Sequence, residues 1–289
     1  MCEVAVVTTG FFDGVHLGHR YVLSTVVSSA RERGEEAVVV TFWPHPRTVL
    51  QQDARDFRLL SSLEEKKSML LSLGIDRMEV IPFSREFAAL TAAQYLELLC
   101  RDYGASLVVM GYDNRIGSDM MTAQEIDRSP VPVVAVGECL SARSEESVSS
   151  TVIRKKLLGG MVGEANAMLG YRYGLYGVVV AGNRLGRTIG FPTANMQLYE
   201  PLKLVPANGV YAVEVEVLGK KYRGMCNIGF RPTVGGNSRT IETHILDFEE
   251  DIYGLPLRLH FLSRLRDEQH FPSLEALKQQ LEKDKEACR

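Results

Sequence analysis

Two histidines stand three residues apart near the start of the chain, in the segment Gly10-Phe11-Phe12-Asp13-Gly14-Val15-His16-Leu17-Gly18-His19. Side chains at that spacing share one face of a helix. The N-terminus of a helix offers free N–H groups to an anion, and glycines let the backbone approach a ligand closely. The segment therefore predicts a turn that binds phosphate with two imidazoles, His16 and His19, rather than a pair of ordinary surface histidines.

Two more polar segments follow predicted strands, Thr41-Phe42-Trp43-Pro44-His45-Pro46-Arg47 and Gly111-Tyr112-Asp113-Asn114-Arg115-Ile116-Gly117. Ligands of open α/β sheets bind beyond the carboxyl ends of the strands, so we expect both segments to share one site with the two histidines. A later segment is Ser149-Ser150-Thr151-Val152-Ile153-Arg154. Its hydroxyl and N–H groups could cap a helix onto a phosphate, with Arg154 one turn further on. A simple helix cap explains Ser150 and Thr151 equally well.

The second half contains the glycine-rich segment Gly182-Asn183-Arg184-Leu185-Gly186-Arg187-Thr188-Ile189-Gly190-Phe191-Pro192-Thr193-Ala194-Asn195. Its glycines permit a tight loop around phosphates. It is not a Walker A sequence, because the GK[ST] ending and the following helix are missing. The Thr193 hydroxyl and the Asn195 carbonyl are hard oxygen donors, suited to a Mg²⁺ ion that bridges ATP phosphates.

The first half alternates apolar strand patterns with amphipathic helix patterns. Two capping boxes, Ser62 with Glu65 and Thr91 with Gln94, mark helix starts. Apolar strands separated by such helices predict a parallel sheet with helices on both faces. The expected strands cover residues 4–8, 37–42, 77–81, 107–110 and 131–136, and the first expected helix covers residues 16–33.

The pattern changes near Ser149, where two short helices are followed by short strand patterns with Gly and Pro turns. These predict a small antiparallel β-barrel with a terminal helix that begins after Ser273 and carries Leu274, Leu277 and Leu281 on one stripe. The expected strands cover residues 175–181, 210–217, 225–228, 244–248 and 257–261. The fold class is therefore α/β plus β, with a Rossmann-like domain over 1–157, a linker helix over 158–171 and a barrel domain over 172–289.

Composition excludes several classes of protein. The 289 residues carry a net charge of −3, so no basic field attracts nucleic acid or a membrane surface. No apolar run approaches a membrane span, and Met1-Cys2-Glu3 lacks the positive region of a signal peptide, so we expect a cytosolic protein. The five cysteines are scattered without a CxxC pair, which argues against a disulfide framework and a zinc site.

The quoted motifs together resemble those of one family. GFFDGVHLGH, TFWPHPR and SSTVIR are similar, in order, to the motifs of HxGH nucleotidyltransferases, and the glycine-rich segment ending in PTAN resembles the riboflavin kinase fingerprint. Over residues 4–284 the chain resembles the bacterial bifunctional riboflavin kinase/FAD synthetase family. The resemblance implies that riboflavin and ATP give FMN and ADP at the C-terminal domain, and that FMN and ATP give FAD and pyrophosphate at the N-terminal domain.

The resemblance also implies residue roles in the first domain. His16 and His19 stabilise charge on the ATP α-phosphate and the departing pyrophosphate, and Arg154 acts with them on the nucleotide phosphates. Asp113 falls at a position that contacts flavin or ATP. Adenylyl transfer needs alignment and charge neutralisation without a covalent enzyme intermediate, which this set could supply. Further nucleotide contacts are implied for Gly10, Phe12, Gly14, Gly18, Ser150 and Thr151.

In the second domain the resemblance makes Glu242 the general base that takes the proton of the ribityl 5′-hydroxyl, a task suited to a carboxylate within hydrogen-bond reach. Thr193 and Asn195 are the implied ligands of Mg²⁺, which enters with ATP. Asn227 and Arg266 are implied flavin contacts, and His244 is expected to be structural. The implied ATP-binding residues are Gly182, Gly186, Arg187, Gly190 and Pro192.

One segment departs from the family, which usually reads close to DFRFG after the fourth strand. Asn114 and Ile116 stand where that pattern has aromatic residues. This leaves open a riboflavin kinase with a weak N-terminal domain. Two further alternatives are a non-enzymatic flavin-binding regulator and another HxGH transferase. The intact Thr193, Asn195 and Glu242 argue against the regulator, because binding alone needs no base, and the second domain argues against the other transferase.

Overall fold

The structure is a computed structural model that describes residues 4–50, 57–137, 148–182, 185–233 and 236–289. The chain forms two units, Met1–Ser150 and Thr151–Arg289, each with its own core. Cys2 and Cys139 lie outside the described residues, and the three described cysteines, Cys100, Cys226 and Cys288, are free thiols. Within the described ranges, no helix is long and apolar enough to cross a membrane.

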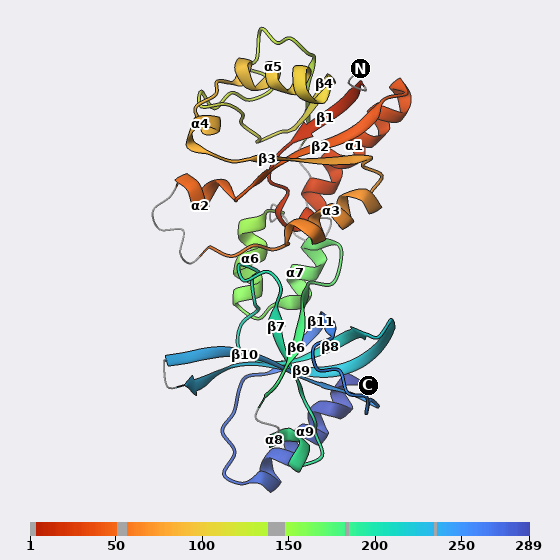
Figure 1. Ribbon diagram of the computed structural model, residues 1–289, viewed down its shortest axis with the longest axis vertical. Coiled ribbons are helices and arrows are strands. Elements are labelled where there is room, and N and C mark those ends of the chain that lie inside the picture. The colour runs from red at the N-terminus through yellow and green to blue at the C-terminus, as the bar shows by residue number, and fades with distance from the viewer. Residues whose placement is uncertain (1–3, 51–56, 138–147, 183–184, 234–235) are drawn as a thin grey trace. The chain divides into compact units, whose positions relative to one another are not determined.

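The described part of the first unit contains a five-stranded parallel sheet in the order β3-β2-β1-β4-β5 (Figure 1). The central strands are buried runs of Val and Ala, as expected for a sheet covered on both faces. The parallel sheet predicted from the sequence is thereby confirmed. Its strands are β1 (Ala5–Thr9), β2 (Glu36–Trp43), β3 (Arg77–Pro82), β4 (Ala105–Gly111) and β5 (Val133–Val136).

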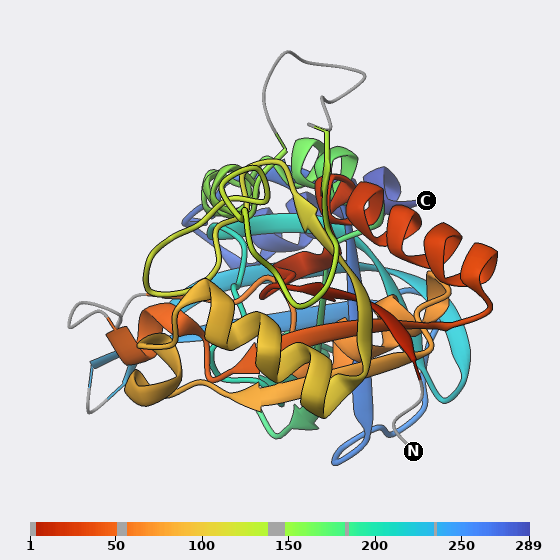
Figure 2. The same cartoon turned by 90° about the horizontal axis from the view of Figure 1, so that it is seen from above.

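Helices cover both faces of this sheet (Figure 2). On one face, α1 (Leu17–Arg33) and α3 (Leu63–Ser72) pack their apolar side chains against Val6, Val39 and Val109. On the other face, α5 (Ala92–Tyr103) packs against a second set of buried strand residues. Both predicted capping boxes are formed. Shorter helices are η1 (Asp13–Val15), α2 (Pro46–Leu50) and α4 (Arg85–Ala88).

The strand order creates a crevice between β1 and β4. From β1 the chain crosses to β2 on one side, whereas β4 pairs on the other side of β1. In a doubly wound sheet the loops at such a switch point diverge, and ligands bind in the space between them. The loops that follow β1 and β4 are those that carry the predicted histidines and Asp113.

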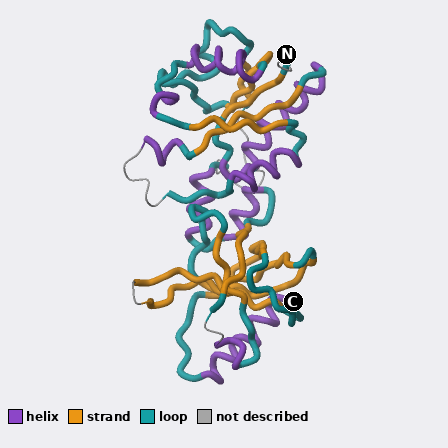
Figure 3. The backbone as a smooth tube through the Cα atoms, viewed as in Figure 1, coloured by secondary structure: helices purple, strands orange, loops and turns teal. Residues whose placement is uncertain are grey.

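The second unit contains, in its described residues, a closed antiparallel barrel in the order β10-β7-β6-β11-β8-β9. This confirms the predicted barrel. Its strands are drawn in orange in the lower part of Figure 3. The strand expected over 244–248 was misplaced: β10 ends at Ile245, because Asp247 turns the backbone into the left-handed region with φ of 54°. The strands are β6 (Gly174–Val180), β7 (Ala194–Leu198), β8 (Gly209–Val217), β9 (Lys220–Thr233), β10 (Gly236–Ile245) and β11 (Pro256–Arg266).

Four helices described in this part of the chain are α6 (Ser150–Leu158), α7 (Val162–Leu169), α8 (Leu185–Thr188) and α9 (Leu274–Cys288). The α7 helix falls within the expected linker, and its Asn166 Nδ2 donates to Phe261 O of the barrel at 2.9 Å. The α9 helix begins after Ser273, as predicted. Its predicted stripe was wrong at one end, since Leu274 is 58% exposed and the buried α9 residues are Asp284 and Cys288.

Candidate active sites

The first candidate site is a cavity of about 330 Å³ at the crevice between β1 and β4. Residues that follow β1 form one wall, and residues that follow β4 form the other. The structure thereby brings together segments that lie about a hundred residues apart in the sequence. Predicted site residues that line the cavity are Gly10, Phe12, His16, Gly18, His19, Asp113 and Ser150.

The two histidines form a single stacked unit at the start of α1. His16 is the N-cap residue, and its Nδ1 accepts a hydrogen bond from the backbone N–H of His19 at 3.3 Å. The two rings stack with their centroids 3.6 Å apart and an interplanar angle of 18°. Burial and the neighbouring His16 hold the pKa of His19 well below its usual range, so the ring is neutral near pH 7. A neutral imidazole offers one N–H donor to an oxygen that gains negative charge.

The turn before these histidines is held in an unusual conformation. Phe12, Gly14 and Val15 all have positive φ, and non-glycine residues in that region cluster at functional sites. The Asp13 carboxylate holds the turn because it accepts hydrogen bonds from the backbone N–H groups of Leu60 and Ser61 at 3.0 Å. Asp13 therefore shapes the turn from behind rather than facing the cavity, and the Gly14 N–H also donates to Ser61 Oγ at 3.0 Å.

The segment that departs from the family pattern divides between the cavity and the core. Asp113 lines the cavity, and Asn114 Nδ2 donates to Thr9 O at the end of β1 at 3.1 Å. Ile116, in contrast, is buried in the core beside α5. Tyr112, which the sequence reading did not single out, is an aromatic side chain on the cavity wall and is 43% exposed.

Ser150 is held in the first unit, where its Oγ donates to Asp13 O at 3.1 Å. Thr151 and Arg154 follow on α6 and belong to the second unit. Their predicted contact with nucleotide phosphates stays a prediction.

The second candidate site is organised by the register of the barrel. Glu242 of β10 pairs with Asn195 of β7 on one side and with Asn227 of β9 on the other. Asn227 pairs in turn with Val210 of β8, which pairs with Arg266 of β11. Paired residues of neighbouring strands point to the same face of a sheet. Four predicted site residues on four strands therefore share one row on the outer face of the barrel, toward α9.

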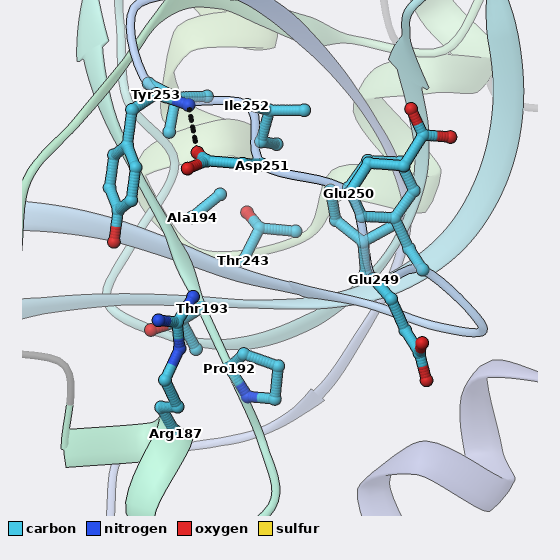
Figure 4. A pocket seen from close by; sticks show the side chains of 13 residues that line it. Arg187, Pro192, Thr193, Ala194, Thr243, Glu249, Glu250, Asp251, Ile252 and Tyr253 are labelled. Carbon is cyan, nitrogen blue, oxygen red and sulfur yellow. Dashed lines mark hydrogen bonds between the residues drawn. The ribbon is translucent and has the colours of Figure 1, made fainter.

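Two pockets meet at Thr193. One is lined by Glu242, Asn227 and Arg266 together with apolar side chains of β8, β9 and α9. The other is lined by Arg187, Pro192 and Thr193 and by residues 249–253 (Figure 4). In Figure 4, Arg187 extends from α8 toward the strand segment that carries Thr193. Thr193 belongs to both linings, so a group held there would lie between the contents of the two pockets.

Close packing explains two glycines of the loop between β6 and β7. A Cβ at Gly182 would lie 2.2 Å from Asn195 Nδ2, and a Cβ at Gly186 would lie 2.2 Å from Phe191 O. Position 186 therefore requires glycine, whereas a side chain at position 182 would have to displace the Asn195 amide. Gly190 has φ of 88°, a conformation that other residues rarely adopt.

Two contacts that the sequence did not indicate hold this second site. Arg266 makes a bidentate ion pair with Asp284 of α9, with Nη2 and Oδ2 2.7 Å apart, and lies over the Phe271 ring at 5.6 Å. His244, expected to be structural, lines the pocket and donates from Nδ1 to Pro192 O at 2.8 Å. Burial lowers the pKa of His244, which keeps the ring neutral and the hydrogen bond to the Thr193 loop uncharged.

Comparison with known proteins explains why the chain holds two sites. The family model described as FAD synthetase matches residues 2–151, and the one described as Riboflavin kinase matches residues 169–289. The bifunctional riboflavin kinase/FMN adenylyltransferase of Bacillus subtilis (strain 168) is 36% identical over 288 residues, which cover 98% of this chain and 90% of that protein. The chain belongs to this bifunctional family. The family member from Escherichia coli (strain K12) is also 36% identical, over 99% of this chain and 92% of its own length.

A solved structure agrees with the family fold. The crystal structure described as a macrolide-efflux protein from Streptococcus pneumoniae superposes with a TM-score of 0.94 at 35% identity, covering 100% of this chain and 95% of that one. In terms of the family, the cavity between β1 and β4 lies within the FAD synthetase match, and the two pockets at Thr193 lie within the riboflavin kinase match.

Proposed function

We propose that the chain converts riboflavin into FAD in two ATP-dependent steps at two separate sites. The barrel transfers the ATP γ-phosphoryl group to the 5′-hydroxyl of riboflavin, which gives FMN and ADP. The first unit then transfers the AMP part of a second ATP to FMN, which gives FAD and pyrophosphate. The observation that carries the kinase step is the single cross-strand row of Asn195, Glu242, Asn227 and Arg266 beside Thr193.

In the kinase step Glu242 acts as the general base. Its carboxylate lines the flavin-sized pocket next to Thr193, where the 5′-hydroxyl of a bound riboflavin would meet the ATP phosphate. Removal of the hydroxyl proton as the new O–P bond forms, while the bond from the γ-phosphorus to ADP breaks, avoids a protonated, positively charged oxygen in the new phosphate ester. Asn227 and Arg266 border the flavin, and the Arg187 guanidinium in the adjoining pocket binds the ATP phosphates.

We propose Mg²⁺ as the divalent ion of this site. The residues present fit it, because Thr193 and Asn195 supply the hydroxyl and carbonyl oxygens that Mg²⁺ prefers, and the missing Cβ at Gly182 leaves room for the Asn195 amide. When bound, the ion neutralises charge on the ATP phosphates. Thr193, which lines both pockets, and Asn195, which lines neither, are the residues that would hold it.

In the adenylylation step the FMN phosphate oxygen attacks the ATP α-phosphorus, and the bond to the pyrophosphate oxygen breaks. The His16–His19 pair lines the cavity in which this charge develops, whereas the Ser150 hydroxyl at its edge donates to Asp13 O. Donors that are already oriented stabilise developing charge without reorganising. The N–H groups at the start of α1 add to this stabilisation. Asp113 and Tyr112, at the far wall, border the second substrate.

The experiment is product analysis by chromatography after the full chain is incubated with riboflavin, ATP and Mg²⁺. FMN should form first and FAD should follow. FMN without FAD would support the kinase-only alternative, and neither product would exclude both activities. The cytosolic location expected from the sequence stays a prediction.

A further inference from the structure

Lys66 is a buried cation behind the first site, and no step described above uses it. It lies on α3 with 1% of its surface exposed, although lysine is almost never fully buried without a partner. Burying an ammonium group is costly, so the groups around its Nζ must compensate for lost water. One of those groups, Phe11, lines the adenylylation cavity, and the others, Asp13 and Thr41, lie behind it.

The first two contacts of Lys66 hold Phe11. Its Nζ lies 3.7 Å from the centroid of the Phe11 ring, a cation–π contact, and donates to Thr41 Oγ1 at 3.3 Å. The Thr41 hydroxyl donates in turn to Phe11 O at 3.3 Å. Both the ring and the peptide of Phe11 are therefore fixed from the Lys66 side. Phe11 itself lines the cavity, with its ring centroid 4.0 Å from that of His45.

The charges that face Lys66 link it to the histidine pair. Asp13 of η1 attracts it, and His19 of α1 experiences its positive charge. Burial lowers the pKa of Lys66 to about 8 in spite of Asp13, so the side chain is mostly charged at pH 7. Burial and the neighbouring His16 lower the pKa of His19 most, and the Lys66 charge lowers it further.

We propose that Lys66 is a positioning residue for adenylyl transfer, which fixes the Phe11 wall and places a positive charge behind His19 without touching substrate. The inference rests on the proposed function of the first unit. Burial and His16 account for most of the lowered pKa of His19, and the Lys66 charge adds to them. The Lys66 charge also attracts the triphosphate from behind the wall, because it lies in a poorly solvated region.

The test compares Lys66→Met, which keeps the length of the side chain but removes its charge, with Lys67→Met at the exposed neighbouring position on α3. Histidine side chains of the full-length chain are titrated by NMR, with His19 assigned from the signal lost in His19→Gln. Removing the Lys66 charge should raise the pKa of His19, and Lys67→Met should leave it unchanged. In parallel, kcat/KM for FAD formation from supplied FMN should fall about tenfold or more in Lys66→Met only, as expected when a site residue is misplaced.

Urea unfolding and the dispersion of the NMR signals of the first unit report whether Lys66→Met is folded there, because riboflavin phosphorylation takes place in the other unit and reports only on that unit. If Lys66→Met fails to fold, Lys66→Gln replaces it with the same expected results. An unchanged His19 titration, or FAD formation equal to that of Lys67→Met, would overturn the proposal. If the wild-type chain forms no FAD, the proposed function fails, whereas the NMR titration still decides whether Lys66 acts on His19.

Discussion

Glu242 of β10 and Asn195 of β7 are direct partners across two antiparallel strands of the barrel. This pairing puts the proposed base and a proposed metal ligand on the same face of the sheet, although they lie 47 positions apart in the sequence. A slip of one residue in this register would turn Glu242 to the opposite face. The kinase site therefore depends on strand pairing as much as on residue type.

Thr193→Val tests the junction of the two barrel pockets. The variant keeps the shape of the side chain but removes the hydroxyl that borders both pockets. We expect riboflavin phosphorylation to weaken by roughly 10–100-fold, since a metal site loses at least this much when one oxygen partner is removed. Steady-state kinetics over a range of Mg²⁺ and ATP concentrations measure the effect. FAD formation from supplied FMN is the internal control, and equal loss of both activities would contradict separate sites.

Asp284→Ala tests the ion pair that ties α9 to the barrel. The Asp284 side chain is 4% exposed and that of Arg266 is 14% exposed, so the variant leaves a nearly buried cation without its carboxylate. We expect a loss of about 3–5 kcal/mol in the free energy of unfolding, measured in urea, together with a higher KM for riboflavin.

The matched control is Asp267→Ala. Asp267 pairs with Arg264 at 2.7 Å, but its side chain is 79% exposed. Exposed pairs contribute about 1 kcal/mol or less. Similar losses in the free energy of unfolding of Asp284→Ala and Asp267→Ala would show that the pair of Arg266 with Asp284 contributes no more than an exposed pair.

Ile116→Phe tests the segment that departs from the family. Because Ile116 lies in the core beside α5, a phenylalanine there has to be accommodated by the core. We expect the first unit to lose about 1–3 kcal/mol of stability without a lower KM for FMN, since an overpacked core strains its neighbours. A lower KM for FMN at unchanged stability would mean that position 116 faces the flavin after all.

The pH dependence of stability reports on Lys66. Its pKa falls from the ordinary 10.5 to about 8 in the folded chain. Between these values the unfolded chain binds more protons than the folded chain, so the contribution of Lys66 to stability rises with pH from about 8 to 10.5. The total rise is about 3 kcal/mol.

The measurement is the free energy of unfolding of wild type minus that of Lys66→Met at several pH values. The difference should favour wild type progressively above pH 8, with Lys67→Met as the control at an exposed position. A difference in the free energy of unfolding that stays constant with pH would show that burial does not lower the pKa of Lys66.

Local signals explain what could be predicted from the sequence. Both capping boxes depend on residues three apart, and the apolar runs of the parallel sheet are continuous, so these features could be predicted from the sequence. The β7 strand could not be predicted, because Ala-Asn-Met-Gln-Leu is short and partly polar and is specified by its neighbours β6 and β10.

The residues that support the two sites could not be predicted from the sequence, for a related reason. Lys66 follows two glutamates on an amphipathic helix and looks like a solvated residue, and only the packing of α3 behind Phe11 shows otherwise. Asp284 likewise interrupts an apolar stripe without any local sign of its partner Arg266. Such contacts form between distant segments, and periodicity carries no information about them.

The central claim is that one chain holds two independent sites, and paired variants test it most directly. Glu242→Gln and His19→Ala are each assayed by chromatography for FMN formation from riboflavin and for FAD formation from supplied FMN. Glu242→Gln should lose FMN formation by a factor of about 10²–10⁴ and keep FAD formation, whereas His19→Ala should do the reverse. Loss of both activities in either folded variant, or loss of neither, would contradict the account.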